Sequence, residues 1–380
     1  MKILTNIQTS YLAGIGQAFW VLVNNLGREK KNNLKIVGIK ILTDPNVVSQ
    51  GVFTDQNPKN FSMVSLNGKN ISDFKELISK AENIDQIKEG YRDLIQSYFE
   101  IIKKESPDLV LINGTYYVPW CLFLAASETK IPVVLHYHGI LSKETSHWPE
   151  KQRNLMKDME RTFDNDRLFY LFPSMLARKT VENEVFGHKI NKSAVVPNPI
   201  ADHFFKIRDI GLRKNIGFVG RWSKIKNPKF IKKLAKYNQN KNDLIINLVS
   251  EKQKAKKMIG EGIKNVRFIK PMDSSKLGNF YAKMGIILSP SYFETYGNVP
   301  QEAIASGTPA LVNSNMGVAE TFQSLGLKDW IINFDSVKTV SKKILETSGM
   351  EVPAKTRECL RQMVSGERIS SQIYNILRNV

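Results

Sequence analysis

Cysteine is nearly absent from this chain of 380 residues, which contains only Cys121 and Cys359. Two cysteines so far apart, without a spacing motif, argue against both a disulfide framework and a cysteine-based zinc site. Small secreted domains that depend on disulfides are therefore excluded as a class. We expect a reducing, cytoplasmic environment.

Long hydrophobic runs are also lacking. A membrane-spanning helix needs about 18 uninterrupted apolar residues, and the longest candidates, residues 12–23 and 117–126, are interrupted or short. The N-terminus runs directly into a strand-like segment, which argues against a signal peptide. The sequence therefore predicts no spanning segment.

Acidic residues are few relative to basic ones, with 36 Asp and Glu against 55 Lys and Arg, giving a formal net charge of +19. Three explanations compete: a lysine-rich composition with solvated side chains, attraction to an anionic membrane surface, and nucleic-acid binding. A nucleic-acid surface needs aromatic residues interleaved with the basic ones, whereas the aromatic residues here fall mostly at core-like positions. We favour the compositional explanation and expect no nucleic-acid partner.

Strand-like and helix-like segments alternate along the chain. One series covers residues 2–172, with a long helix expected over 85–104, and a second covers 216–332. Residues 195–199 lie between the two series and contain two prolines, which is typical of a linker. Such alternation predicts parallel sheets covered by helices on both faces. The expected fold is α/β, with two doubly wound Rossmann-like domains facing each other across a cleft.

The most informative segment is residues 289–303. An apolar strand precedes Glu294, a Gly297-Asn298 turn follows, and Glu302 lies one turn into the next helix. A tight turn into a helix N-terminus lets an anionic phosphate rest on backbone N–H groups, and two carboxylates could hold sugar or ribose hydroxyls. These features together suggest a nucleotide-sugar site. The alternative is an exposed loop acid and a helix acid in its favourable first turn.

A second turn of this kind follows the strand at residues 216–219. Asn227 is a good helix N-cap and Pro228 suits the first helical turn. Arg221 and Lys226 would both project near the end of the strand. Cationic groups there could neutralise a departing diphosphate. The alternative is a basic, solvated helix start.

Three weaker signals lie in the first half of the chain. Gly14 and Gly16 mark a strand-to-helix turn that could approach a phosphate or be a simple tight turn. Alternation along the strand at 133–138 places His136 and His138 on the same side, and no third ligand for a metal can be assigned. Asp164-Asn165-Asp166 follows a charged helix and is interpreted as a polar loop.

The chain resembles the retaining glycosyltransferases of family 4, which have two Rossmann-like domains (the B-type glycosyltransferase fold). Matches to the family's motifs run in the family's order along nearly the whole chain. The last of them, the paired-glutamate signature, is long and specific. Two positions depart from the family pattern: Pro199 replaces a glycine, and Ser250-Glu251-Lys252 replaces a glycine-rich turn. The matching segments are residues 13–16, 134–139, 195–204, 220–227 and 294–309.

The resemblance implies a role for each matching residue. The donor sugar would contact Glu294, and Glu302 would hold the ribose hydroxyls. The diphosphate would be bound by cationic side chains in the place that magnesium has elsewhere, so no metal or other cofactor is expected. The remaining implied roles are diphosphate binding by Arg221 and Lys226, backbone contacts from Gly14, Gly16, Tyr296, Gly297, Asn298 and Val299, and a position near the reacting centre for His138.

The implied reaction is transfer of a hexose, with retention, from a nucleoside diphosphate sugar to a hydroxyl of a glycan or lipid-linked acceptor. A nucleotide-sugar epimerase or hydrolase on the same fold is the alternative, and a nucleic-acid-binding protein is the alternative from another class. Residues 1–198 would form the acceptor-side domain and 199–367 the donor domain, with the helix at 368–377 crossing back to the first.

An anionic membrane surface is the second expected partner. The basic stretch 151–167, together with Trp148, Leu155 and Met156, could dock on such a surface. The protein would then be cytoplasmic and peripheral on the inner face of the plasma membrane.

Overall fold

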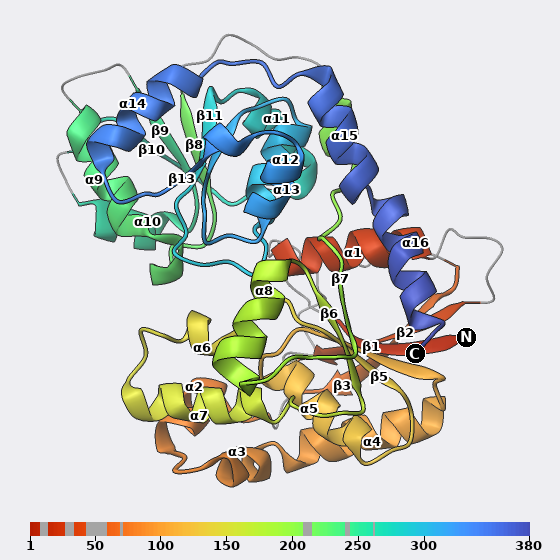
Figure 1. Cartoon of the computed structure of the whole chain (residues 1–380). Helices are drawn as coiled ribbons and strands as arrows, with labels where there is room; N and C mark the ends of the chain where they lie inside the picture. Colours follow the sequence, from red (N-terminus) through yellow and green to blue (C-terminus); the bar gives the residue numbers. More distant parts are fainter. Residues whose placement is uncertain are drawn as a thin grey trace. The chain divides into compact units, whose positions relative to one another are not determined.

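The chain folds into two compact units. The computed structural model describes residues 1–7, 14–26, 34–42, 59–68, 71–207, 215–239, 244–260 and 263–380. Unit 1 contains Met1–Pro197 and Ile369–Val380, and unit 2 contains Asn198–Arg368 (Figure 1). The division falls within the proline-containing segment, one residue from the boundary that the sequence suggests.

Unit 1 is built on a seven-stranded sheet with the strand order β3-β2-β1-β4-β5-β6-β7, in which every pairing is parallel. The central strands are buried along their whole length, as expected for a parallel sheet covered on both faces. The more polar edge strand, β3, was not anticipated from the sequence. The strands are β1 (Lys2–Asn6), β2 (Lys35–Leu42), β3 (Phe61–Asn67), β4 (Leu109–Asn113), β5 (Val133–His136), β6 (Leu168–Phe172) and β7 (Ser193–Val195).

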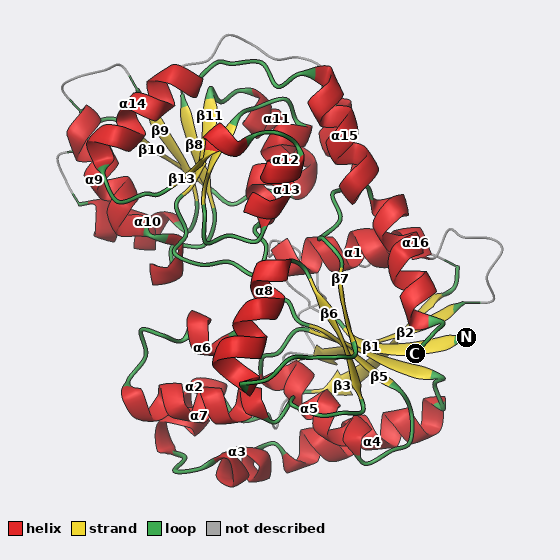
Figure 2. Cartoon of the chain, viewed as in Figure 1, coloured by secondary structure: helices red, strands yellow, loops and turns green. Residues whose placement is uncertain are grey.

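Helices cover this sheet on both sides. On one side, Ile369, Ile373 and Leu377 of α16 (Gly366–Leu377) join the apolar core that α1 (Gly14–Leu26) forms with the strands. Figure 2 shows α4 and α5 on the opposite side. The other helices of unit 1 are α2 (Phe74–Lys80), α3 (Ile84–Gly90), α4 (Arg92–Glu105), α5 (Tyr117–Ser127), α6 (Leu141–Glu144), α7 (Glu150–Arg161), α8 (Met175–Thr180) and a π-helical turn at Val181–Phe186.

The prediction of one long helix over residues 85–104 is wrong in one respect, because this segment forms two helices. α3 ends at Gly90, and Tyr91, with φ −115° and ψ 13°, leaves helical geometry before α4 begins. The Tyr91 ring is buried and stacks on Phe74 and Tyr117. Packing of this ring therefore favours the break, which the apolar periodicity of the sequence did not reveal.

Unit 2 is built on a six-stranded sheet with the order β10-β9-β8-β11-β12-β13, again entirely parallel. Three of its strands, β9, β11 and β12, are short and buried along their whole length. Figure 2 shows α9, α10 and α14 on one side of the sheet and α11, α12 and α13 on the other. The strands are β8 (Ile216–Val219), β9 (Ile246–Val249), β10 (Val266–Ile269), β11 (Ile286–Ser289), β12 (Ala310–Asn313) and β13 (Ile331–Ile332).

Seven α-helices follow these strands within the described part of unit 2. Short 3₁₀ turns occupy Asp202–Lys206, Lys224–Lys226 and Lys328–Trp330. The fold is therefore α/β with two Rossmann-like units, as the sequence predicts. The helices are α9 (Pro228–Asn238), α10 (Lys252–Ile259), α11 (Ser274–Ala282), α12 (Asn298–Ala305), α13 (Val318–Ser324), α14 (Val337–Thr347) and α15 (Ala354–Val364).

Each sheet has one point at which the strand order reverses. In unit 1 this switch point lies between β1 and β4, and in unit 2 it lies between β8 and β11. Ligands of open α/β sheets bind outside the carboxyl ends of the strands at such a point. A ligand site is therefore expected in the loops that follow these four strands.

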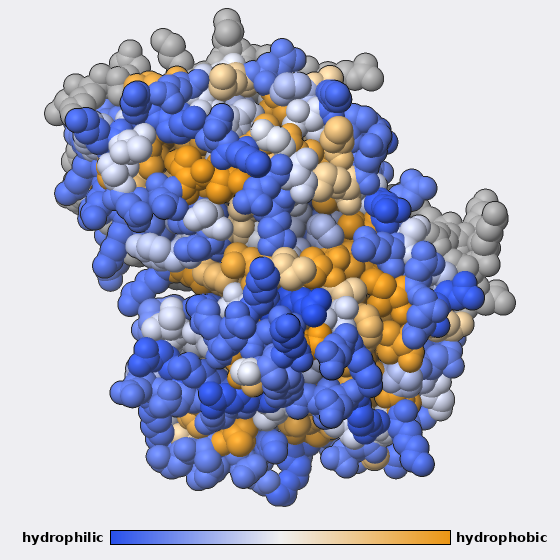
Figure 3. Space-filling model, in the orientation of Figure 1, coloured by the Kyte–Doolittle hydropathy of each residue, from blue (hydrophilic) through white to orange (hydrophobic). Residues whose placement is uncertain are grey.

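The visible face of the molecule is largely polar. Hydrophilic side chains cover most of the face shown in Figure 3, with smaller hydrophobic patches interspersed. Among the residues that the structure describes, no helix combines the length and apolarity needed to cross a membrane.

Candidate functional site

Two loops meet at the switch point of unit 2. One follows β8 and leads into α9, and the other follows β11 and leads into α12. Their strands are parallel neighbours, with Ile286 opposite Ile216. The backbone N–H of Tyr292 donates a hydrogen bond to the carbonyl of Ile225 at 2.8 Å, so the two loops are joined directly.

Lys226 and Glu294 face each other across these loops. The Lys226 Nζ lies 2.7 Å from Oε2 of Glu294, and both side chains are half-buried. The Ser291 hydroxyl donates to the other carboxylate oxygen, Oε1, at 2.6 Å. Both oxygens of Glu294 are thus held in place. The structure brings together two residues that the sequence placed in separate segments, whereas Arg221, in the same loop as Lys226, is exposed.

Gly297 makes the turn into α12. Its φ of +101° is a conformation that residues with side chains rarely adopt, and a Cβ there would lie 2.5 Å from Cε of Met316. α12 begins at Asn298, and its N-cap residue, Gly297, makes no side-chain capping hydrogen bond. A Cβ at Gly297 would also lie 3.5 Å from Oε2 of Glu294. The positive end of α12, with Val299 in its first turn, therefore lies next to the Lys226–Glu294 pair.

The segment predicted as a linker stabilises this helix start. Asn198 donates from Nδ2 to Oδ1 of Asn298 at 2.9 Å and accepts at its carbonyl from Nε2 of Gln301 at 3.2 Å. The Tyr296 hydroxyl donates to Oε1 of Gln301 at 2.8 Å. Because the Tyr296 side chain is buried, only its backbone is placed for the ligand contact that the family resemblance implies.

Glu302 lies in different surroundings from Glu294. Its side chain is only 8% exposed, and its Oε2 accepts a hydrogen bond from the Tyr281 hydroxyl at 2.8 Å. Burial raises the pKa of Glu302 to about 7, although the Tyr281 hydrogen bond acts in the opposite direction. Glu302 therefore changes its charge near neutral pH.

Two residues of this site were missed at the sequence level. Ser291 could have been found, because it lies three positions before Glu294 in the same loop and can reach back to the carboxylate. Tyr281 offers no comparable signal, since it lies in the preceding helix α11 and reaches Glu302 only through helix packing.

The predicted N-cap of α9 is confirmed. Asn227 adopts a left-handed conformation, with φ +55°, and its side chain accepts from the backbone N–H of Phe230 at 3.2 Å. Pro228 occupies the first helical turn. Lys226 directly precedes this N-cap in the loop after β8, so the same turn fixes its position.

The histidine pair of unit 1 lies at the end of β5. The strand ends at His136, two residues earlier than predicted, and the centroids of the His136 and His138 rings are 3.7 Å apart. Both side chains are buried. Burial lowers the pKa of His136 to about 4 and places the pKa of His138 well below 6.5. Both imidazoles are therefore neutral at pH 7.

The predicted glycine turn needs a correction. Gly14 and Gly16 lie within the first turn of α1, which begins at Gly14, rather than in a turn before the helix. Ala13, which belongs to the same predicted segment, and the five residues before it lie outside the described residues.

The described residues contain no cluster of three or more His, Cys, Asp and Glu side chains that could hold a metal. The Asp164-Asn165-Asp166 segment is a polar loop, as interpreted from the sequence. Asp164 accepts from Nε2 of His188, with 2.8 Å between Oδ2 and Nε2.

The proposed membrane-docking residues include two that cannot serve this role. Leu155 and Met156 are buried on the inner face of α7, because this face packs on the unit's core. Of the nearby cations, Lys151 pairs with Glu82 at 2.5 Å. The prediction is therefore wrong for Leu155 and Met156, whereas docking through the partly exposed Trp148 and the basic side chains stays a prediction.

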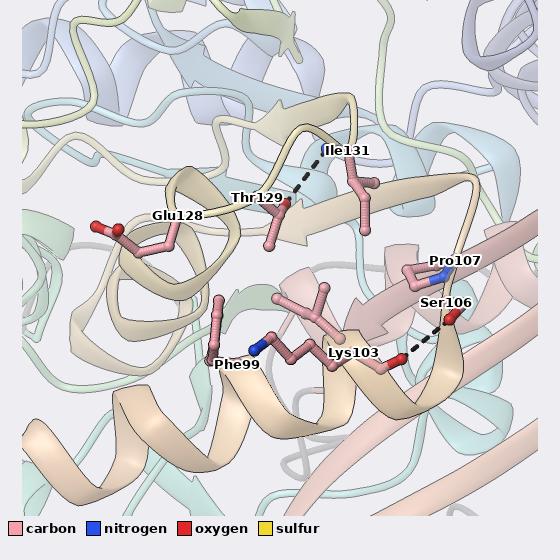
Figure 4. Close-up of a pocket in the computed structure, with 8 residues that line it drawn as sticks. Phe99, Lys103, Ser106, Pro107, Glu128, Thr129 and Ile131 are labelled. Atoms are coloured by element: carbon pink, nitrogen blue, oxygen red, sulfur yellow. Dashed lines mark hydrogen bonds between the residues drawn. The ribbon is translucent and has the colours of Figure 1, made fainter.

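A surface pocket in unit 1 lies away from these residues (Figure 4). Its lining comes from the end of α4 with Ser106 and Pro107, which precede β4, and from Glu128, Thr129 and Ile131, which precede β5. It thus lies at the amino ends of the strands, opposite the edge where ligands of such sheets bind. None of the predicted site residues lines it.

Comparison with known proteins identifies the fold and the second unit. Residues 200–362 match the family model described as glycosyl transferases group 1. The matched residues make up most of unit 2. A stretch of 54 residues is 43% identical to D-inositol 3-phosphate glycosyltransferase 2 of Catenulispora acidiphila, covering 14% of this chain and 13% of that protein.

Solved structures resemble the whole chain. Sucrose-phosphate synthase from Thermosynechococcus elongatus superposes with a TM-score of 0.79 at 14% identity, covering 100% of this chain and 98% of that one. HepE from Anabaena, in complex with UDP and glucose, gives a TM-score of 0.66 at 15% identity, covering 100% of both chains. The chain therefore has the B-type glycosyltransferase fold, and the paired-glutamate segment lies inside the residues that match the group 1 family model.

Proposed function

We propose that this protein is a retaining glycosyltransferase that moves a hexose from a nucleoside diphosphate sugar to a hydroxyl group of an acceptor. The Lys226–Glu294 pair beside the N-terminus of α12 carries this proposal. It combines a cation, a positive helix end and a fixed carboxylate at the switch point of a glycosyl transferase group 1 domain.

The cationic groups would act on the leaving diphosphate. Negative charge grows on the bridging oxygen as the bond between sugar and phosphate breaks, and preorganised positive groups stabilise it without reorganisation. Lys226 supplies a half-buried point charge, the start of α12 supplies backbone N–H groups, and the exposed Arg221 supplies a planar donor fork. Because these groups would stabilise the charge that a metal ion stabilises elsewhere, we propose that the reaction is metal-independent.

The two glutamates would position the donor. Glu294, oriented by Ser291 and Lys226, would accept hydrogen bonds from sugar hydroxyls. Glu302, oriented by Tyr281, would accept them from the ribose. The backbone of residues 296–299 would approach the phosphate and sugar. The neutral imidazole of His138 would hydrogen-bond the donor sugar near the reacting carbon, and Gly14 and Gly16 would allow close backbone approach to a phosphate.

The acceptor and location are also proposals. A glycan or a lipid-linked acceptor is consistent with a glycosyl transferase domain, and glycolipid or surface-polysaccharide synthesis would place the enzyme in the cytoplasm beside the inner membrane face. Co-sedimentation with anionic vesicles tests this. Binding at low salt that disappears at high salt would support electrostatic attachment, and no binding at low salt would contradict it.

The donor proposal is tested by ligand binding. A thermal-shift screen of UDP, GDP, ADP and their sugar conjugates should raise the unfolding temperature for one nucleotide class, because a ligand of the native state stabilises it by mass action. Isothermal titration with that nucleotide should show weaker binding to Glu302→Ala than to the exposed control Glu346→Ala. Equal affinity in the two variants would remove the ribose role.

Product analysis completes this test. Once the bound donor is identified, a transferase transfers its sugar to an acceptor. A hydrolase or an epimerase converts the donor when no acceptor is present. If no nucleotide or nucleotide sugar shifts the unfolding temperature or titrates, the proposed function is wrong.

A further inference from the structure

The two charged side chains of the candidate site have partners within the chain itself. Nζ of Lys226 lies 2.7 Å from Oε2 of Glu294. The Ser291 hydroxyl donates to the other carboxylate oxygen, Oε1, at 2.6 Å. Within the described residues, Lys226 forms no second ion pair. A diphosphate that binds the Lys226 ammonium group therefore competes with Glu294 for it.

The Glu294 carboxylate also lies beside the start of α12. A Cβ at Gly297, the residue that precedes this helix, would be 3.5 Å from Oε2 of Glu294. An anion near a helix N-terminus is stabilised by the backbone N–H groups there. Glu294 thus places its own negative charge where a cation and a helix end meet. An ammonium group has three donors and could bridge two anions, but a phosphate bound there would be repelled by the nearby carboxylate.

Of the two partners, Lys226 is the one that can move. The backbone of Glu294 is held on both sides, because its N–H donates to the carbonyl of Asn315 at 3.3 Å and its carbonyl accepts from Gly317 at 3.1 Å. Lys226 has a flexible four-carbon stem, and it lies beside Gly220, where an added Cβ would be 3.9 Å from its Cδ and Cε. The ammonium group can therefore change its partner by rotation of the lysine side chain, whereas the carboxylate stays in place.

A sugar supplies what the carboxylate loses when Lys226 turns to a phosphate. An ionised carboxylate only accepts hydrogen bonds, and each sugar hydroxyl can donate one. The Glu294 side chain is half-buried, and leaving such a group without a partner costs stability. Hydroxyl donors at this place offset the loss of the ammonium group. A nucleoside diphosphate has no hydroxyl beyond its phosphates, so it brings Glu294 only negative charge.

We propose that the Lys226–Glu294 ion pair makes the site distinguish a nucleotide sugar from a free nucleoside diphosphate. With a nucleotide sugar, Lys226 turns to the diphosphate and the sugar hydroxyls take its place on Glu294. With the nucleoside diphosphate alone, nothing replaces Lys226 on the carboxylate, and binding is weaker. The proposal rests on the glycosyltransferase function proposed above. It adds a means of product release, since Glu294 recaptures Lys226 once the sugar has left.

Glu294→Gln tests this exchange by isothermal titration of the full chain. Glutamine has nearly the size of glutamate and can still accept from Ser291, so the variant should fold, which thermal unfolding checks. The probes are the nucleoside diphosphate and the nucleotide sugar identified by the thermal-shift screen. The variant should bind the nucleoside diphosphate at least about fivefold more tightly than the unmodified protein does. The ratio of dissociation constants, nucleoside diphosphate over nucleotide sugar, should fall by a similar factor.

An exchange of partners differs from simple repulsion in its dependence on Lys226. Simple repulsion between Glu294 and the diphosphate would give Glu294→Gln the same gain in affinity with or without Lys226. The exchange predicts a gain at least about threefold smaller in the Lys226→Met background, because no ammonium group is there to be released. Glu346→Gln removes an exposed carboxylate elsewhere in unit 2 and should leave the affinity for the nucleoside diphosphate unchanged.

Any of three results would overturn the proposal. The first is a Glu294→Gln variant that binds the nucleoside diphosphate no more tightly than the unmodified protein does. The second is a ratio of dissociation constants that does not fall, and the third is an equal gain with and without Lys226. If one of these is found while the unmodified protein binds the nucleotide sugar, the exchange alone is wrong. If no nucleotide or nucleotide sugar binds to the unmodified protein, the proposed glycosyltransferase function is wrong, and the exchange with it.

Discussion

The two units share one architecture and differ in the charge of their switch points. Unit 2 has the Lys226–Glu294 ion pair where β8 and β11 end. Unit 1 has the uncharged side chains of Asn6 and Asn113 where β1 and β4 end. The fold therefore supplies the same place twice, and the loop residues decide which ligand chemistry each place accepts.

The overall charge follows the same division. Unit 2 contains 29 of the 55 Lys and Arg residues but only 15 of the 36 Asp and Glu residues, whereas unit 1 is close to balanced. A cationic unit attracts polyanions such as a nucleoside diphosphate. Most of the net charge of +19 thus lies in unit 2, the unit that matches the group 1 family model. A lysine-rich composition alone does not account for this uneven distribution.

The largest expected effect is on Lys226. Lys226→Ala should lower turnover by roughly 10²–10³-fold on a confirmed donor, because one preorganised electrostatic group is lost from the leaving-group site. The exposed Lys229→Ala, two residues into α9, is the control for loss of one positive charge and should stay near the unmodified rate. Initial-rate kinetics measure both, and an unchanged rate in Lys226→Ala would show that unit 2's charged pair does not act on the diphosphate.

The next prediction concerns the pH dependence of the free energy of unfolding, to which Glu302 contributes. Burial raises its pKa from 4.5 to about 7, so the folded protein holds a proton that the unfolded chain releases. The contribution of Glu302 to stability is therefore present below pH 4.5 and is lost as pH rises to 7, by roughly 3 kcal/mol.

Glu302→Gln should remove this dependence. Its free energy of unfolding, measured by urea denaturation, should exceed that of the unmodified protein by an amount that grows between pH 5 and 7 and then levels off. The exposed Glu346→Gln should show no such trend. A difference that stays constant with pH would contradict the burial effect on Glu302.

Gly297→Ala should destabilise unit 2 by roughly 1–3 kcal/mol from the positive φ alone, with a further cost from the contact at Met316. Gly187 in unit 1 is the matched control, since its φ is +77° and a Cβ there would meet nothing within 4 Å. Urea unfolding should therefore show a larger loss for Gly297→Ala than for Gly187→Ala. Equal losses would mean that Met316 moves aside without cost.

The smallest expected effect is at the N-cap of α9. Asn227→Ala should cost about 1 kcal/mol of stability through loss of the cap, plus a cost for placing alanine at φ +55°. Asn227→Gly should cost less, because glycine adopts this conformation readily. Thermal unfolding of the pair measures the difference, and a glycine variant less stable than the alanine variant would rule out this explanation.

Much of the fold could be predicted because its signals are local. Short apolar segments that alternate with helices predict the parallel sheets, and Asn227 with Pro228 predicts the start of α9. The prediction failed where packing overrides the local pattern. Tyr91 interrupts an apparently continuous helix through its stacked ring, and Leu155 and Met156 are buried although their helix is strongly charged.

The candidate site could be predicted only in part for the same reason. Glu294, Gly297 and Glu302 form one continuous motif, so their proximity along the chain was visible. The partners that orient them come from other segments, as with Tyr281 beside Glu302 and Asn198 beside Asn298. No pattern in the sequence links such residues. Their roles in binding and catalysis remain predictions.

The sequence by itself determined two parallel sheets, their apolar strands and the turns that begin α9 and α12, because each depends on neighbouring residues. Only the tertiary structure decided that β8 lies beside β11 and β1 beside β4. This order results from burying every strand between helices and cannot be read from any one strand. It brings Lys226 within 2.7 Å of Glu294 and fixes Asn113 against Asn6.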